Sequence, residues 1–150
     1  MGRVPGGPYA GHWSTGLSPA INRGMGFFTK LLGITPKKQP LHIDDDNFQR
    51  EVLQSKEPVI LDVWGPNCQP CKKLEPIIMQ LAAEYDGRVK VCELNSHDAP
   101  RTAMRLKVKG TPTVLYFKGG REKERVVGMR GSLFHEQSIE ELFGIPKEAE

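Results

Sequence analysis

The sequence predicts an α/β fold with a central mixed β-sheet flanked by helices on both faces. Residues 58–64, "PVILDVW", form a continuous apolar run rich in β-branched residues, as expected of a central strand covered on both faces. A helical stretch and a second strand at 88–95 come next, and this order predicts a parallel pair joined by a right-handed crossover. Two later strands flank Gly119-Gly120, a pair suited to a tight antiparallel hairpin.

Elements on either side of residues 58–64 are predicted by local patterns. "LHI" at 41–43 predicts a short strand, and Asp44 can cap a helix that runs to about Gln54 with an apolar edge formed by Phe48, Val52 and Leu53. After the apolar run, a long helix is predicted by one apolar stripe, which consists of Leu74, Ile77, Ile78, Leu81, Ala82 and Tyr85. We expect this long helix to pack on the sheet.

The C-terminal half adds two helices to the strands of the hairpin. A short helix is predicted from about Pro100 to Leu106, before the strands that lie within residues 108–131. A final amphipathic helix, from about His135 to Phe143, closes the domain. The chain shows no internal repeat.

Residues 1–40 differ in composition from the rest of the chain. They hold eight Gly, five Pro and five basic residues, no Asp or Glu, and no sustained hydrophobic period. We therefore expect a disordered basic tail over 1–40 and one domain over 41–150, because 150 residues suffice for a single core. Of the 21 basic residues, 16 remain in the domain against 18 acidic ones, so the domain offers no footprint for nucleic acid.

The sequence favours a reducing compartment. Three cysteines in 150 residues are too few for a disulfide-stapled secreted module. No secretory signal is found, and the most apolar stretch of the tail, residues 25–34, is interrupted by Lys30 and is too short to span a membrane. We expect a cytoplasmic protein, with import into mitochondria or plastids as the alternative, because the tail is basic and lacks acidic residues.

Cys68 and Cys71 stand at the predicted start of the long helix. A cysteine is nucleophilic as the thiolate, and a helix N-terminus offers unpaired N–H groups and a positive partial charge that lower the pKa of a thiol. Pro70 fits the first helical turn, where its missing N–H costs nothing, and it brings Cys71 back toward Cys68. Lys72 and Lys73 add modest positive potential or simply face solvent.

Two other roles compete with that of a reactive dithiol. The pair would supply two of the four ligands of a zinc site, but no second pair exists, Cys92 lies in a predicted strand, and the four histidines lack ligand spacing. Inert buried thiols are the other alternative. Against it, Gly65, Pro66 and Asn67 favour a loop at the end of a strand, where α/β sheets place their sites.

The segment 41–145 resembles the thioredoxin family. A Cys-x-Pro-Cys-Lys motif, Asp62 six residues before the first cysteine, and Thr-Pro-Thr at 111–113 together make the resemblance specific. The matching pieces occur in the family's order and spacing and are "LHIDDDNFQREVL", "PVILDVWGPNCQPCKKLEPII", "YDGRVKVCELN", "VKGTPTVLYFKGG" and "VVGMRG". The tail before Leu41 is not covered.

The resemblance implies the thioredoxin fold and the chemistry of a protein-disulfide reductase. Cys68 would attack a disulfide of a substrate protein, and Cys71 would then attack Cys68 and release the reduced substrate. Asp62 matches the family's buried base, and desolvation is expected to raise its pKa so that it can take the Cys71 proton near neutral pH. A solvated Asp at a strand end is the alternative. No cofactor is implied beyond the redox-active Cys68–Cys71 disulfide.

The same resemblance assigns further residues to substrate binding. Pro112 matches the family's cis proline, and Thr111 would offer backbone groups to an extended substrate segment. Trp64 should pack beneath the active loop, while Gly110 and Gly128 would let a substrate backbone approach closely or serve as ordinary turn glycines. The loop around the cysteines completes this set with Asn67, Gln69 and Pro70.

The chain departs from the family pattern near the cysteines and in one strand. Asn67 and Gln69 replace a Trp and a Gly that are common in the family, which leaves substrate fit and redox potential open. Glu93 stands where the family often has a Lys, and strand alternation puts it on the sheet face of Val91. We hypothesise that Asp62 and Glu93 hold one proton between them, which would raise the apparent pKa of the pair.

We therefore expect a thiol-disulfide oxidoreductase that acts on disulfide-containing substrate proteins and takes electrons from a thioredoxin-reductase-like donor. The alternatives are a disulfide oxidase or isomerase in an oxidising compartment, and a non-catalytic docking module of the same fold. We expect a monomer that does not bind nucleic acid and has no membrane span. Cys92 is expected to be a small core residue, with a regulatory thiol as the alternative.

Overall fold

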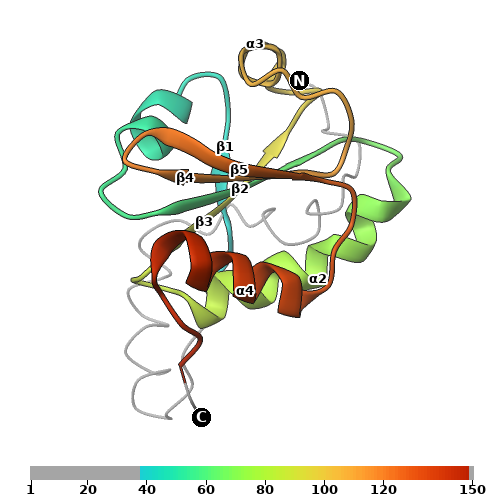
Figure 1. Cartoon of the computed structure of the whole chain (residues 1–150). Coiled ribbons are helices and arrows are strands. Elements are labelled where there is room, and N and C mark those ends of the chain that lie inside the picture. Colours follow the sequence, from blue (N-terminus) through green and yellow to red (C-terminus); the bar gives the residue numbers. More distant parts are fainter. Residues whose placement is uncertain (1–37, 149–150) are drawn as a thin grey trace, which may run out of the picture.

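The structure, a computed structural model, describes residues 38–148 (Figure 1). The predicted tail, residues 1–40, lies almost entirely outside the described residues, so its disorder and the domain boundary stay predictions. In chain order the elements are β1 (Leu41–Ile43), η1 (Gln49–Leu53), β2 (Val59–Trp64), α2 (Gln69–Glu84), β3 (Lys90–Asn95), α3 (Pro100–Arg105), β4 (Thr113–Lys118), β5 (Arg121–Val127) and α4 (Ser132–Phe143).

The five strands form one mixed sheet in the order β1-β3-β2-β4-β5. β3 pairs in parallel with both β1 and β2, whereas β4 pairs antiparallel with β2 and β5. The predicted parallel pair and the predicted hairpin are thus confirmed. At the hairpin Gly119 and Gly120 have φ angles of 61° and 75°. A Cβ on Gly120 would also lie 2.5 Å from the backbone oxygen of Leu53, so this position has room only for glycine.

Two layers of buried side chains cover the two faces of the sheet. Figure 1 shows α2 and α4 on one side of the sheet and η1 and α3 on the other. All six residues of β2 are buried, as predicted for a central strand, and they alternate between the layers. The α2 layer includes Ile60, Trp64, Cys71, Leu74, Val91 and Tyr116, and the α3 layer includes Ile43, Phe48, Leu61, Val63, Cys92 and Leu94.

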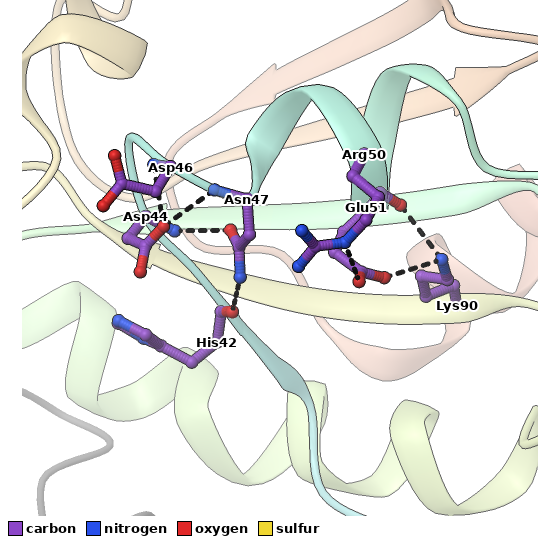
Figure 2. Close-up of polar contacts among 7 residues, drawn as sticks. All are labelled: His42, Asp44, Asp46, Asn47, Arg50, Glu51 and Lys90. Carbon is purple, nitrogen blue, oxygen red and sulfur yellow. Dashed lines mark hydrogen bonds and ion pairs between the residues drawn. The ribbon is translucent and has the colours of Figure 1, made fainter.

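The first helix is shorter than the sequence predicts. A turn comes after β1, and the helix itself is one π-helical turn, η1. In the turn, the Asp44 carboxylate accepts hydrogen bonds from the backbone N–H groups of Asp46 and Asn47 at 2.8 and 2.9 Å (Figure 2). The prediction that Asp44 caps the helix is therefore wrong, because the N-cap of η1 is Phe48 and the bonds of Asp44 stabilise a turn that takes up the first residues of the expected helix.

The last helix is longer than the sequence predicts. α4 begins at Ser132, three residues before the predicted start, and ends where Gly144 adopts a left-handed φ of 71°. Its first turn carries the exposed Leu133, which breaks the apolar stripe that marks a packed helix in a sequence. Among the residues that the structure describes, no helix combines the length and apolar character needed to span a membrane.

Candidate active site

Cys68 and Cys71 are joined by a disulfide at the N-terminus of α2. Cys68 is the N-cap residue, with an extended backbone, and its Sγ accepts a hydrogen bond from the backbone N–H of Cys71 at 3.2 Å. Pro70 lies in the first turn, where no intrahelical N–H bond is lost. Asn67 turns the chain from strand to helix with a φ of 57°, a conformation that Asn tolerates better than most residues.

The two sulfur-bearing residues differ in exposure. Cys71 is completely buried and packs in the α2 layer with Ile60 and Trp64. Cys68 is only partly buried, and its neighbours Asn67 and Gln69 are exposed. An incoming molecule can therefore reach the sulfur of Cys68 but not that of Cys71.

Beside Cys68 lies the Thr111–Pro112 peptide bond, which is cis, as the family resemblance led us to expect. The Sγ of Cys68 lies 3.5 Å from the backbone oxygen of Thr111. On the other side, the backbone N–H of Gly128 donates to the oxygen of Pro112 at 2.8 Å. Three segments far apart in the sequence thus meet around the exposed sulfur.

An open groove of about 400 Å³ runs past this point. It gathers five of the residues that we assigned to substrate binding, together with two that we did not, and its lining is Gln69, Pro70, Lys73, Thr111, Pro112, Gly128 and Met129. The sequence offered a signal for both additions, because Lys73 lies one helical turn after Gln69 and Met129 comes directly after Gly128.

Three residues assigned to substrate binding do not line this groove. Asn67 and Gly110 are exposed in the loops beside it. Trp64 is buried in the α2 layer, as predicted, and its indole N–H donates to Glu93. The roles of all three in binding stay predictions.

Gly65, at the end of β2, allows three loops to approach one another. A Cβ there would lie 3.3 Å from the side-chain oxygen of Ser96, which comes after β3, and 3.5 Å from that of Thr111, which precedes β4. The distance to Ser96 is shorter than most contacts of a real Cβ atom, so the loops fit together more easily because Gly65 has no side chain.

Two acidic side chains, Asp62 and Glu93, are completely buried beneath α2. They are register partners on the parallel strands β2 and β3, and the bond from Trp64 places Glu93 in the α2 layer, on the face that alternation predicts. The solvated alternative for Asp62 is therefore wrong. The buried Asp62 shares its sheet face with Cys71, although its role as a base stays a prediction.

Both oxygens of Glu93 have hydrogen-bond partners. Trp64 Nε1 donates to Oε2, and His42 Nδ1 contacts Oε1 from the edge strand β1. The hydrogen bond to Glu93 raises the pKa of the His42 imidazole above its ordinary value. In the sequence His42 is one of four scattered histidines without ligand spacing, but alternation along "LHI" puts it on the face opposite the buried Ile43. The hypothesis of a proton shared with Asp62 stays a prediction.

Cys92 is buried in the α3 layer, away from the cysteine pair. Burial raises the pKa of its thiol, so the residue is unreactive and serves as a small core residue, as predicted. Within the part of the chain that the structure describes, no group of three or more His, Cys, Asp or Glu side chains is placed to hold a metal ion.

Comparisons with known proteins agree with this geometry. The family model described as Thioredoxin matches residues 39–140. The chain is 41% identical over 91 residues to the chloroplastic thioredoxin M-type of Spinacia oleracea, covering 61% of this chain and 50% of that protein. It is 38% identical over 86 residues to a thioredoxin of Synechocystis sp., covering 57% of this chain and 80% of that protein. The chain thus spans about half the length of the plant relatives that it matches.

Proposed function

Because the chain belongs to the thioredoxin family, we propose that it is a thiol-disulfide oxidoreductase that reduces protein disulfides through the Cys68–Cys71 pair. The observation that carries this proposal is a disulfide at a helix N-terminus with one sulfur accessible and the other buried. A loop of so few residues gains little stability from closure, which argues against a purely structural bond.

The reaction begins with the reduced pair. The Cys68 thiolate attacks one sulfur of a substrate disulfide, forms a mixed disulfide and displaces the other substrate sulfur as a thiolate. Cys71 then loses its proton, and its thiolate attacks the Sγ of Cys68. This step closes the Cys68–Cys71 bond and expels the second substrate sulfur. Two electrons have passed to the substrate, and a donor reductase must return two electrons to the enzyme.

The position of Cys68 favours its ionised form. The backbone N–H of Cys71 already points at its Sγ in the disulfide state, at 3.2 Å. The same donor and the positive end of α2 would stabilise a thiolate at that place. Cys71, in contrast, is surrounded by apolar side chains and needs a base before it can react.

Asp62 is the base that we assign to Cys71. It is fully buried on the sheet face that α2 and Cys71 cover. Burial favours the neutral form of a carboxyl group, so a carboxylate here gains by accepting a proton from the Cys71 thiol.

The groove beside Cys68 is proposed to hold an extended segment of the substrate. Backbone groups of Thr111 lie next to the reactive sulfur, and an extended chain can pair with such groups as an added strand does. Lys73 supplies the charged side chain of the lining, and Pro70, Pro112 and Met129 contribute apolar side chains to it.

For location and partners we propose a plastid or an equivalent photosynthetic setting in place of the cytoplasm that the sequence suggested. Several similar proteins are plant thioredoxins whose names carry the word chloroplastic, and others come from cyanobacteria. The basic, acid-free stretch of residues 1–40 supports an imported form. We further propose disulfide-containing substrate proteins, a thioredoxin-reductase-like donor and a monomeric state.

The proposal is tested by reduction of insulin disulfides with dithiothreitol as the electron source. The full chain should accelerate the reaction, Cys68→Ser should abolish the acceleration, and Cys92→Ala should keep it. Equilibration with glutathione then separates a reductase from an oxidase or isomerase. The cysteine pair of a reductase stays reduced at the ratio of reduced to oxidised glutathione that is found in the cytosol. An inactive full chain would leave the docking-module alternative, and a Cys68→Ser variant as active as the wild type would show that the Cys68–Cys71 pair does not carry the reaction.

A further inference from the structure

A row of three side chains crosses the sheet from its edge to its centre beneath α2. His42 on β1 is the register partner of Glu93 on β3, and Glu93 is the register partner of Asp62 on β2. Register partners in adjacent parallel strands point to the same face of the sheet. The three side chains therefore stand side by side on one face, one on each of three neighbouring strands. The row leads from the edge strand to the buried carboxylate that the proposed function assigns to Cys71.

Exposure falls steeply along this row. The side chain of His42 is 49% exposed, whereas that of Glu93 is fully buried and Asp62 has no exposed surface. His42 is therefore in contact with both water and the buried Glu93 carboxylate. Asp62 lies on β2, and Glu93 on β3 stands between it and the half-exposed His42 on β1.

The two partners of Glu93 have different chemical capacities. Trp64 Nε1 can only donate a hydrogen bond, so it holds one oxygen of the carboxylate in place. His42 Nδ1 can donate or accept, depending on which nitrogen carries the proton. A proton can thus pass between Glu93 and His42, whereas it cannot pass to Trp64.

The backbone around His42 is fixed by the turn that comes after β1 (Figure 2). Asn47 Nδ2 donates to the backbone oxygen of His42 at 2.9 Å, and Asn47 Oδ1 accepts from the backbone N–H of Asp44 at 2.8 Å. These two bonds tie the edge strand to its turn. The imidazole consequently keeps its place against Glu93 although half of it faces water.

Among the residues that the structure describes, three acidic groups act on the charge of the imidazole. They are Glu93 from β3, Asp44 from the turn after β1 and Asp98 from the turn after β3. The hydrogen bond to Glu93 has the largest effect and raises the pKa of His42. Burial lowers this pKa, and the negative charges of the three carboxylates raise it further. The pKa of His42 is therefore raised above its ordinary value, and the imidazole is the titratable group of this row that also faces solvent.

We propose that His42 is a positioning residue for proton release, which carries the proton that Cys71 gives up from the buried Asp62 and Glu93 carboxylates to solvent. The inference rests on the proposed function. When Cys71 attacks Cys68, its proton goes to Asp62. Transfer along the row then gives it to Glu93 and to Nδ1 of His42, and Nε2 releases a proton to water. No electrons move in these steps, and the carboxylates end as they began.

The test measures how fast the mixed disulfide is resolved in the full chain. Reduced protein is mixed with a disulfide-containing peptide, quenched in acid and analysed by mass, across a range of pH values. His42→Gln keeps a hydrogen-bond donor for Glu93 but cannot titrate. It should resolve the mixed disulfide about tenfold more slowly at neutral pH and lose the inflection of the wild-type profile above pH 6.5. His97→Gln, the same change at an exposed histidine in the turn after β3, should match the wild type.

Imidazole rescue separates proton transfer from structural support. In His42→Ala, added imidazole should restore the rate in proportion to its concentration, because the vacated place is open to water. A uniform loss of rate at every pH without rescue, or a wild-type profile in His42→Gln, would overturn the role of His42. A wild-type chain that forms no mixed disulfide would instead overturn the proposed function.

A measurement on the unaltered chain guards against variants that fold poorly. The titration of His42 is monitored by nuclear magnetic resonance in the oxidised and the reduced protein, with His97 as the internal reference. The midpoint of His42 should differ between the two states by several tenths of a pH unit, because the proton occupancy of the row changes with Cys71. Equal midpoints in the two states would contradict the proposal.

Discussion

The two faces of the sheet are both closely packed, yet they differ in chemistry. The α2 layer contains buried groups that ionise or form polar contacts, among them Asp62, Glu93 and His135, on the sheet face that also carries the buried Cys71. The α3 layer is mainly apolar, with the buried hydroxyl groups of Thr102 and Thr113 among its polar groups, and its one thiol, Cys92, is made unreactive by burial. Burial alone therefore does not decide reactivity. The difference lies in whether a helix N-terminus and titratable neighbours meet at the same place.

The largest effect expected is a contrast between one cysteine of each layer. Cys71→Ser should trap the mixed disulfide on Cys68 and lower turnover by at least about a thousandfold, because no second sulfur can release the substrate. Cys92→Ala should keep wild-type turnover and lose about 1–2 kcal/mol of stability through the small cavity it leaves. Insulin reduction and chemical denaturation measure the two quantities. Equal turnover in the two variants would remove the distinction between the layers.

The next effect concerns His135, which is fully buried in the α2 layer with its Nδ1 2.6 Å from the hydroxyl of Tyr116. Burial lowers the pKa of His135 to about 4. In the unfolded chain it takes up a proton near pH 6.5, so its contribution to stability is complete above that value and is lost as the pH falls toward 4. We expect a loss of about 3 kcal/mol over this interval.

The matched variant for this prediction is His135→Gln, which can keep a bond to Tyr116 but does not titrate. Denaturant unfolding of the wild type and the variant between pH 4 and 7 shows how steeply the free energy of unfolding changes with pH in each protein. The contributions of the other titrating groups are the same in both proteins and cancel in the difference. Parallel stability curves for the two proteins would show that His135 is not neutral in the folded state.

A smaller effect is expected for Asp62→Asn. The amide cannot accept the Cys71 proton, so resolution of the mixed disulfide should slow by about ten- to a hundredfold at neutral pH. The loss should shrink as the pH rises, because hydroxide can take the proton instead. Rapid quenching in acid and mass analysis measure this rate, with formation of the mixed disulfide as the internal control. A rate equal to that of the wild type at pH 7 would show that Asp62 is not the base.

Much of this difference between the layers could be predicted from single residues and their spacing. The alternation in β3 placed Glu93 on one face and Cys92 on the other, and both assignments hold because a strand has a period of two. The position of Cys68 at a helix start was indicated by Pro70 and by the apolar stripe beyond it. These features depend on short stretches of sequence and are therefore visible in it.

The features that the sequence did not reveal depend on contacts between distant segments. The pairing of His42 with Glu93 joins residues 51 positions apart, and a three-residue edge strand offers too little pattern to fix its register. The presence of Lys73 and Met129 in one groove was also missed, because the two residues come from segments far apart in the sequence. The π-helical turn of η1 was missed because side-chain bonds of Asp44 compete with the helix, which apolar spacing does not record.

The contact at Gly65 has a consequence for how such chains diverge. Three separate connections, after β2, after β3 and before β4, share the space that an absent side chain leaves there. A side chain at Gly65 would press on Ser96 and touch Thr111, and the connection before β4 includes the Thr111 carbonyl beside the reactive sulfur. Changes in these connections should therefore be inherited together, as a linked set, whereas the hairpin and the exposed turns can drift one residue at a time.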